Sequence, residues 1–145
     1  LGRIAHAAVE HAREQVAALF PPGGRVIFTS GATEALNLAL RGLPGSGPIA
    51  CSAIEHAAVG DTACALGPVQ ELAVSRDGIC AADQPLAPGT RAVCVMQVNN
   101  EIGTVQPLAD WRAAAEPCLT DSMPRLIASV APLVKITRPP SGSRA

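Results

Sequence analysis

Short apolar segments alternate with helical patterns along residues 2–116, and this alternation constrains the fold more than any other feature of the sequence. Glycine and proline punctuate the segments, most clearly at 21–24 (PPGG), which ends the first helical pattern. Strands that are separated by helices connect through crossovers, and crossovers join parallel strands. The alternation therefore predicts an α/β fold, with a parallel sheet covered by helices on its faces.

The periodicity also locates the individual elements. In parallel sheets, ligands bind beyond the carboxyl ends of the strands, so the turns that follow the first, second and strongest strands are expected to meet at one cleft. The first helix carries an apolar stripe that includes Ile4, Val16 and Leu19. The expected helices cover residues 2–20, 32–41, 55–66 and 107–116, and the expected strands cover residues 25–29, 48–52, 69–74 and 91–98.

Composition limits the classes of function. The 145 residues are 48% apolar, which suits one folded domain, and a net charge of −1 argues against nucleic acid or an anionic membrane as a partner. No apolar run is long enough to span a membrane and no signal peptide precedes the first helix, so a cytoplasmic protein is expected. Five scattered cysteines without a C-x-x-C pair predict reduced thiols and no metal site, with Cys94 as a buried apolar residue.

The turn at residues 30–33 (SGAT) lies between an apolar segment and a helical pattern. The first N–H groups of a helix have no partner within it and carry the positive end of the helix dipole, so such a junction can bind an anion. Gly31 would let a ligand approach the backbone closely. The alternative is an ordinary helix start in which Ser30 or Thr33 is the N-cap.

Two more polar turns follow apolar segments. His56 comes directly after the second strand, where an imidazole can stack on a planar ligand and transfer protons, although a structural histidine is the alternative. The segment 99–104 (NNEIGT) follows the strongest strand. It is either a loop whose amides bind a ring substituent of a ligand or simply a turn.

These three motifs, in this order, closely resemble the cysteine desulfurases of the class V aminotransferase group, which use pyridoxal phosphate. The matching segments are 28–34 (FTSGATE), 55–59 (EHAAV) and 98–107 (VNNEIGTVQP), and the resemblance covers residues 2–111. It implies the three-layer, parallel-sheet large domain of fold type I pyridoxal-phosphate enzymes, here incomplete. It also implies that Ala32 and Thr33 bind the cofactor phosphate, that His56 stacks on the pyridine ring and assists proton transfer, and that Asn100 binds the ring hydroxyl.

The resemblance weakens after residue 111. Asp121 is similar to the aspartate that pairs with the pyridine nitrogen, with a turn aspartate as the alternative. Covalent pyridoxal chemistry needs a lysine, and Lys135 is the single lysine of the chain, with an exposed tail lysine as the alternative. The expected organisation is a partial cofactor-binding large domain over residues 1–122 and a divergent, basic, proline-rich tail over residues 123–145.

The family reaction converts L-cysteine to L-alanine and leaves the sulfur on an enzyme cysteine as a persulfide. The resemblance thus implies L-cysteine as substrate, a sulfur-acceptor protein as possible partner, and a homodimer. None of the five cysteines matches the family's acceptor loop, and the chain begins at Leu1, so a truncated and impaired enzyme is expected. The alternatives are a non-catalytic, degenerate fragment and another class V member such as a selenocysteine lyase.

Overall fold

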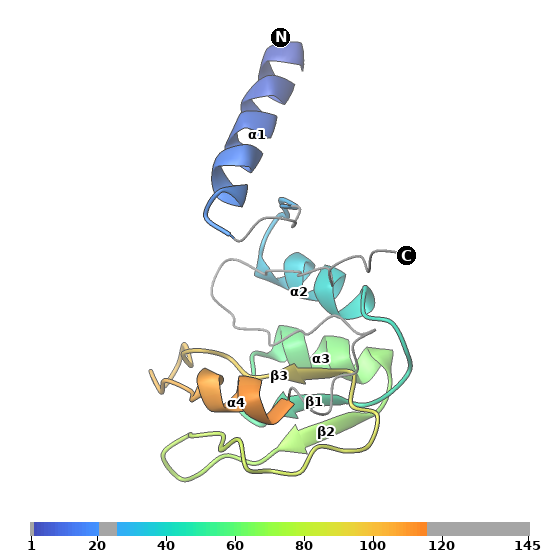
Figure 1. Ribbon diagram of the computed structural model, residues 1–145, viewed down its shortest axis with the longest axis vertical. Helices are drawn as coiled ribbons and strands as arrows, with labels where there is room; N and C mark the ends of the chain where they lie inside the picture. The colour runs from blue at the N-terminus through green and yellow to red at the C-terminus, as the bar shows by residue number, and fades with distance from the viewer. Residues whose placement is uncertain (1, 21–25, 116–145) are drawn as a thin grey trace, which may run out of the picture.

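The computed structural model describes residues 2–20 and 26–115, in which three short strands form a parallel sheet of order β2-β1-β3 (Figure 1). Ile49 of the central strand lies opposite Val69 on one side and Ala92 on the other. This arrangement confirms the predicted parallel α/β fold. The strands are β1 (Ile49–Ser52), β2 (Val69–Leu72) and β3 (Ala92–Cys94).

Helices cover both faces of this sheet. Leu40 of α2 and Val59 of α3 pack with Ile49 on one face, and Trp111 of α4 packs with Val93 on the other. Alternate residues of a strand point to opposite faces, which is how β1 and β3 contribute to both cores. The molecule therefore has the predicted three layers. The helices are α1 (Gly2–Ala17), α2 (Ala32–Arg41), α3 (Ala57–Leu66) and α4 (Leu108–Ala115).

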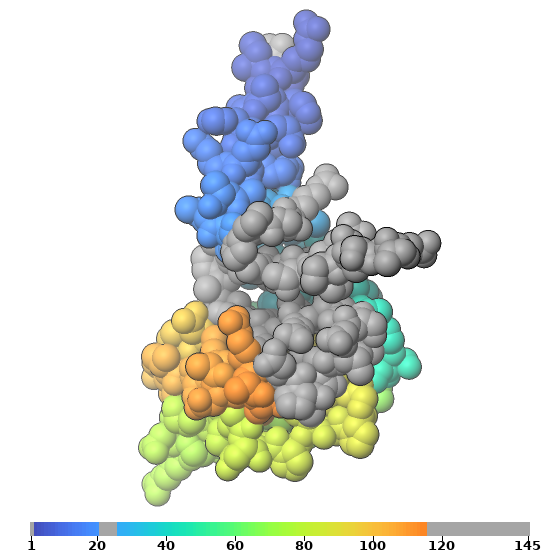
Figure 2. All heavy atoms as spheres, viewed as in Figure 1, coloured from blue at the N-terminus to red at the C-terminus, as the bar shows by residue number. Residues whose placement is uncertain are grey.

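The first helix stands apart from these layers. Figures 1 and 2 show α1 projecting from the body, and none of its residues is buried. The helix was correctly predicted, but no residue on its apolar stripe is buried, and Ile4 is 74% exposed.

The predicted strand over residues 25–29 is wrong. Residues 26–29 pair with no strand of the described sheet, and the side chains of Ile27 and Phe28 are about half exposed. This segment contacts α1 instead. The guanidinium of Arg13 donates a hydrogen bond to the carbonyl oxygen of Val26 (2.5 Å) and lies 4.9 Å from the ring centre of Phe28.

The strongest predicted strand is also shorter than expected. Pairing of β3 ends at Cys94 because the next backbone groups bind elsewhere: the N–H of Met96 donates to the side chain of Glu55, and Val98 forms an isolated antiparallel bridge with Val105. The chain thus turns into the 99–104 loop directly after the sheet. No helix within residues 2–20 and 26–115 has the length and apolar character needed to cross a membrane.

Candidate cofactor site

The start of α2 offers unpaired backbone donors. Gly31 is the N-cap, and no side chain caps the helix. The first helical hydrogen bond runs from the N–H of Ala35 to the carbonyl oxygen of Gly31 (3.1 Å), so the N–H groups of Ala32, Thr33 and Glu34 have no acceptor among the described residues. The alternative interpretation, in which Ser30 or Thr33 is the N-cap, is wrong. An uncapped helix start with three free N–H groups is suited to an anion.

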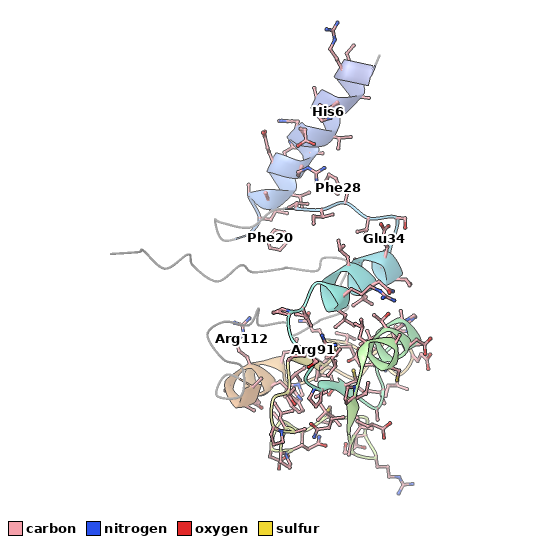
Figure 3. All side chains as sticks on the ribbon, turned by 90° about the vertical axis from the view of Figure 1, so that its right-hand side faces the viewer. His6, Phe20, Phe28, Glu34, Arg91 and Arg112 are labelled. Carbon is pink, nitrogen blue, oxygen red and sulfur yellow. The ribbon has the colours of Figure 1, made fainter. Side chains whose placement is uncertain are left out.

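Glu34 fixes the conformation of this turn. Its Oε2 atom accepts hydrogen bonds from the Ser30 hydroxyl (2.7 Å) and from the Ser30 N–H (2.6 Å), and these two bonds lower the pKa of the Glu34 carboxyl. Figure 3 shows Glu34 at the beginning of α2, where the extended segment joins the helix. The Ser30 hydroxyl is therefore already used within the turn, whereas the Thr33 hydroxyl makes no hydrogen bond to a described residue.

His56 has a structural role that also orients its ring. It is the N-cap of α3, and its Nδ1 atom accepts a hydrogen bond from the N–H of Ala58 (3.1 Å). An accepting Nδ1 carries no proton, so the neutral ring bears its proton on Nε2. The residue is exposed, and Nε2 is available to a ligand.

The two asparagines of the third turn differ in role. Asn99 is buried, and its Oδ1 accepts from the N–H groups of Glu101 (2.8 Å) and Ile102 (3.0 Å). Its Nδ2 donates to the carbonyl oxygen of Ile54 (3.1 Å). Asn99 thus builds the loop, whereas Asn100 is exposed and its side chain has no hydrogen-bond partner among the described residues. Only Asn100 keeps its amide for a ligand.

Sequence reasoning gave no role to Glu55. Its Oε1 atom accepts from the N–H of Met96, while its Oε2 atom is buried without a partner among the described residues. Burial raises the pKa of the Glu55 carboxyl to about 7, although the Met96 hydrogen bond opposes the shift. The available signal was a carboxylate between Ile54 and His56, just after the end of a strand, but it resembles a surface residue when only the sequence is seen.

The structure brings the three turns to one end of the sheet. The His56 turn and the 99–104 loop are joined by two hydrogen bonds, from Met96 to Glu55 and from Asn99 to Ile54. Helix α2 returns to the opposite end, where Leu43 packs in the same cluster as the first residue of β1, so its N-terminus lies toward the carboxyl ends of the strands (Figure 1).

Two other predicted site residues, Asp121 and Lys135, lie outside the described residues, as does the predicted boundary between residues 122 and 123.

The described cysteines are free thiols. Cys51 and Cys94 lie opposite each other on β1 and β3, and both are buried, as was predicted for Cys94. The hydrogen bond to Cys51, together with burial, raises the pKa of the Cys94 thiol well above its ordinary value. Cys64 is exposed on α3. Within residues 2–20 and 26–115, no three His, Cys, Asp or Glu side chains gather in a way that would hold a metal ion.

A three-layer α/β fold with an anion-binding helix start is shared by many enzymes, and comparison with known proteins identifies the family. The model of the family "Aminotransferase class-V" matches residues 1–118. Cysteine desulfurase IscS of Pseudomonas aeruginosa (strain LESB58) is 43% identical over 121 residues, which cover 74% of this chain and 30% of that protein. The mitosomal cysteine desulfurase of Encephalitozoon cuniculi (strain GB-M1) is 40% identical over 124 residues, covering 75% and 29%.

Solved structures agree with these matches. DndA from Streptomyces lividans superposes with a TM-score of 0.70 at 36% identity, covering 82% of this chain and 37% of that one. SspA, solved in complex with cysteine, gives a TM-score of 0.60 at 33% identity, covering 68% and 31%. The chain therefore belongs to the class-V aminotransferase family, and its resemblance to cysteine desulfurases is confirmed. It spans about three tenths of the length of the curated relatives named here.

Proposed function

We propose that this chain supplies the phosphate- and ring-binding part of a cysteine desulfurase site for pyridoxal phosphate. The observation that carries the proposal is the uncapped start of α2, where the N–H groups of Ala32, Thr33 and Glu34 are free and the Thr33 hydroxyl is unused. Backbone N–H groups at a helix start bind phosphate through hydrogen bonds and the helix dipole. The family match supports pyridoxal phosphate as the source of that phosphate.

The other residues would bind the ring. His56 presents Nε2 beyond the end of β1, where its ring would stack on the pyridine and hold a proton for transfer. Asn100 would donate its free amide to the ring hydroxyl. By the family resemblance, Asp121 would pair with the pyridine nitrogen and Lys135 would bind the cofactor covalently. When bound, pyridoxal phosphate supplies an electron sink for bond cleavage at the substrate α-carbon and β-carbon.

The proposed reaction is the conversion of L-cysteine to L-alanine, with sulfur passed to an enzyme cysteine and then to an acceptor protein. SspA, solved in complex with cysteine, supports this substrate class. Selenocysteine is the alternative substrate, and cofactor binding without catalysis is the alternative activity. The homodimeric state and a cytoplasmic location belong to the same proposal.

Gly31→Ala tests the phosphate cradle. Apart from its chain neighbours, a Cβ at Gly31 would meet no atom of a described residue within 4 Å, and its φ of 170° is extended backbone that alanine also adopts, so the fold should tolerate the change. A bound phosphate would meet that Cβ, and we expect pyridoxal-phosphate affinity to fall about tenfold, which is about 1.4 kcal/mol. Fluorescence titration of the full chain measures it.

Gly2→Ala is the matched control, because a Cβ there also meets nothing within 4 Å among the described residues and the position lies on α1, which projects from the body. It should leave affinity unchanged. Equal affinity of Gly31→Ala and the wild-type protein would mean that phosphate does not bind at this helix start.

A second measurement separates binding from catalysis. Borohydride reduction with pyridoxal phosphate, followed by mass spectrometry, should place the adduct at Lys135, because it is the single lysine of the chain. Binding without a Lys135 adduct would favour the non-catalytic alternative. With a Lys135 adduct, alanine release from L-cysteine and from L-selenocysteine then distinguishes the two enzyme alternatives.

A further inference from the structure

Glu55 forms a bridge between two of the proposed cofactor-binding turns. It lies three residues after β1 ends at Ser52 and immediately before His56, and its Oε1 atom accepts from Met96, two residues after β3 ends. A second hydrogen bond, from the Nδ2 atom of Asn99 to the carbonyl oxygen of Ile54 (3.1 Å), joins the same two segments. The turn before α3 is thus held to the segment that leads into the 99–104 loop at two adjacent points.

The surroundings of Glu55 make it an unusual choice for this bridge. Its Oε2 atom is buried without a partner among the described residues, and Cys51, Cys80 and Cys94 lie close enough to feel its charge. Burying a carboxyl group without full hydrogen bonding destabilises the folded protein. A residue that destabilises the folded protein in this way, at the end of the sheet where ligands bind, is typical of a functional site rather than of a stabilising core.

We propose that Glu55 is a positioning residue, whose carboxyl group clamps the segment after β3 to the His56 turn and so holds His56 and Asn100 against one cofactor. The inference rests on the proposed function, because it assigns a task to Glu55 only if His56 and Asn100 bind pyridoxal phosphate. The clamp requires a side-chain oxygen atom that accepts from the N–H of Met96, and it does not require a negative charge. Glutamine would retain that acceptor, and it resembles the neutral carboxyl that burial favours.

The test compares Glu55→Leu with Glu55→Gln in the full-length chain. Without cofactor, NMR-detected amide exchange should show that Met96 N–H loses its protection in Glu55→Leu and keeps it in Glu55→Gln. With cofactor, Glu55→Leu should bind pyridoxal phosphate about tenfold more weakly, which is the size of one lost hydrogen bond to the cofactor. The absorption maximum of the bound cofactor should move in Glu55→Leu and return in Glu55→Gln.

Glu71→Leu is the matched control, since Glu71 is an exposed carboxylate on β2 and should change neither measurement. If Glu55→Leu does not fold, Glu55→Asp replaces it, because a side chain one methylene shorter withdraws the acceptor from Met96 and should show the same losses. Full Met96 protection in the variant that lacks the acceptor would overturn the proposal, as would unchanged affinity and spectrum. The proposal would also be overturned if Glu55→Gln bound pyridoxal phosphate as weakly as Glu55→Leu.

Failure of the proposed function has a different signature. In that case the wild-type chain itself binds no pyridoxal phosphate. The positioning role of Glu55 is then refuted together with the proposed function, whatever the amide-exchange data show. If the wild-type chain binds the cofactor but Glu55→Leu binds it equally well, only the role of Glu55 is refuted.

Discussion

Arg91, which is buried, and Glu55, which is half-buried, are ionisable side chains beside the same sheet, but they lie at opposite ends of it. Arg91 immediately precedes β3 and is 5% exposed, and its guanidinium donates to the carbonyl oxygens of Gly45 (2.8 Å) and Leu66 (3.2 Å). These acceptors lie on the connection that follows α2 and at the last residue of α3. Glu55 instead accepts from Met96 at the carboxyl ends of the strands. Figure 3 shows Arg91 within the body, whereas Arg112 lies on α4.

The two ends of the sheet differ in the groups that surround Arg91 and Glu55. Each residue has one buried atom without a partner among the described residues, Nε of Arg91 and Oε2 of Glu55, so an unpaired atom alone does not mark a site. Arg91 binds only carbonyl groups that connect elements of the fold. Around Glu55 lie an exposed imidazole, at His56, and an exposed free amide, at Asn100. The buried cation at the amino end therefore joins elements of the fold, whereas the carboxyl end exposes the side chains that the proposed cofactor would use, at the end of the sheet where open parallel sheets generally bind ligands.

The largest effect that separates the two ends should come from Arg91→Met. The change removes two charge-assisted hydrogen bonds and leaves their acceptors unpaired, so the free energy of unfolding should fall by about 3 kcal/mol. Urea denaturation measures it. Arg112→Met on the exposed surface of α4 is the control and should cost less than about 0.5 kcal/mol. The comparison would break if the folded fraction of Arg91→Met lost its affinity for pyridoxal phosphate, because the amino end would then contribute to the site.

Glu55 should make stability depend on pH. Its pKa is raised by burial from 4.5 to about 7 in the folded protein, so between these values the folded state binds more protons than the unfolded state. The free energy of unfolding should therefore decrease as pH rises, by about 2 kcal/mol between pH 5 and 7. The facing titratable groups are the thiols of Cys51, Cys80 and Cys94. The hydrogen bond with Cys94 lowers the pKa of Cys51, whereas burial raises the pKa of Cys80, and the hydrogen bond with Cys51 together with burial raises that of Cys94.

Glu55→Gln removes the titrating group and keeps the Met96 hydrogen bond, so subtracting its stability profile from that of the wild-type protein isolates the contribution of Glu55. Glu71→Gln, at an exposed position, should follow the wild-type profile. Parallel profiles of Glu55→Gln and wild type would show that the Glu55 carboxyl is not buried as the structure has it.

The alternation of apolar and helical segments was enough to predict most of the fold. Helix α2 has the predicted bounds, and β1 and β2 fall inside their predicted ranges, because glycine, proline and polar turns limit each segment locally. The exceptions depend on distant contacts. The apolar segment over 26–29 has the composition of a strand but pairs with no described strand. Strand β3 stops early, where the side chain of Glu55 from another turn accepts from the N–H of Met96, two residues beyond the strand.

The candidate site shows the same limit. The glycine turn and His56 are visible in sequence because each directly follows an apolar segment, and the structure shows their local conformation. Asn99 and Asn100 are adjacent asparagines, and only the fold shows that the first is buried in the loop and the second is exposed. Glu55 and Arg91 could not be assigned because their partners, such as Met96 and Gly45, are 41 and 46 residues away.

Substitutions of His56 should have the smallest effect on the free energy of unfolding. They distinguish a capping role from a ligand-binding role most sharply, because the two roles use different atoms of one side chain. His56→Ala removes the Nδ1 acceptor from the start of α3 and should reduce the free energy of unfolding by about 1 kcal/mol. His56→Asn restores a capping oxygen without a ring, so its stability should lie within about 0.5 kcal/mol of wild type. Both variants lack the imidazole and should show the same altered absorption spectrum of bound pyridoxal phosphate. If His56→Asn restores the spectrum together with the stability, His56 is only a cap, and the carboxyl end loses its proposed ring-binding residue.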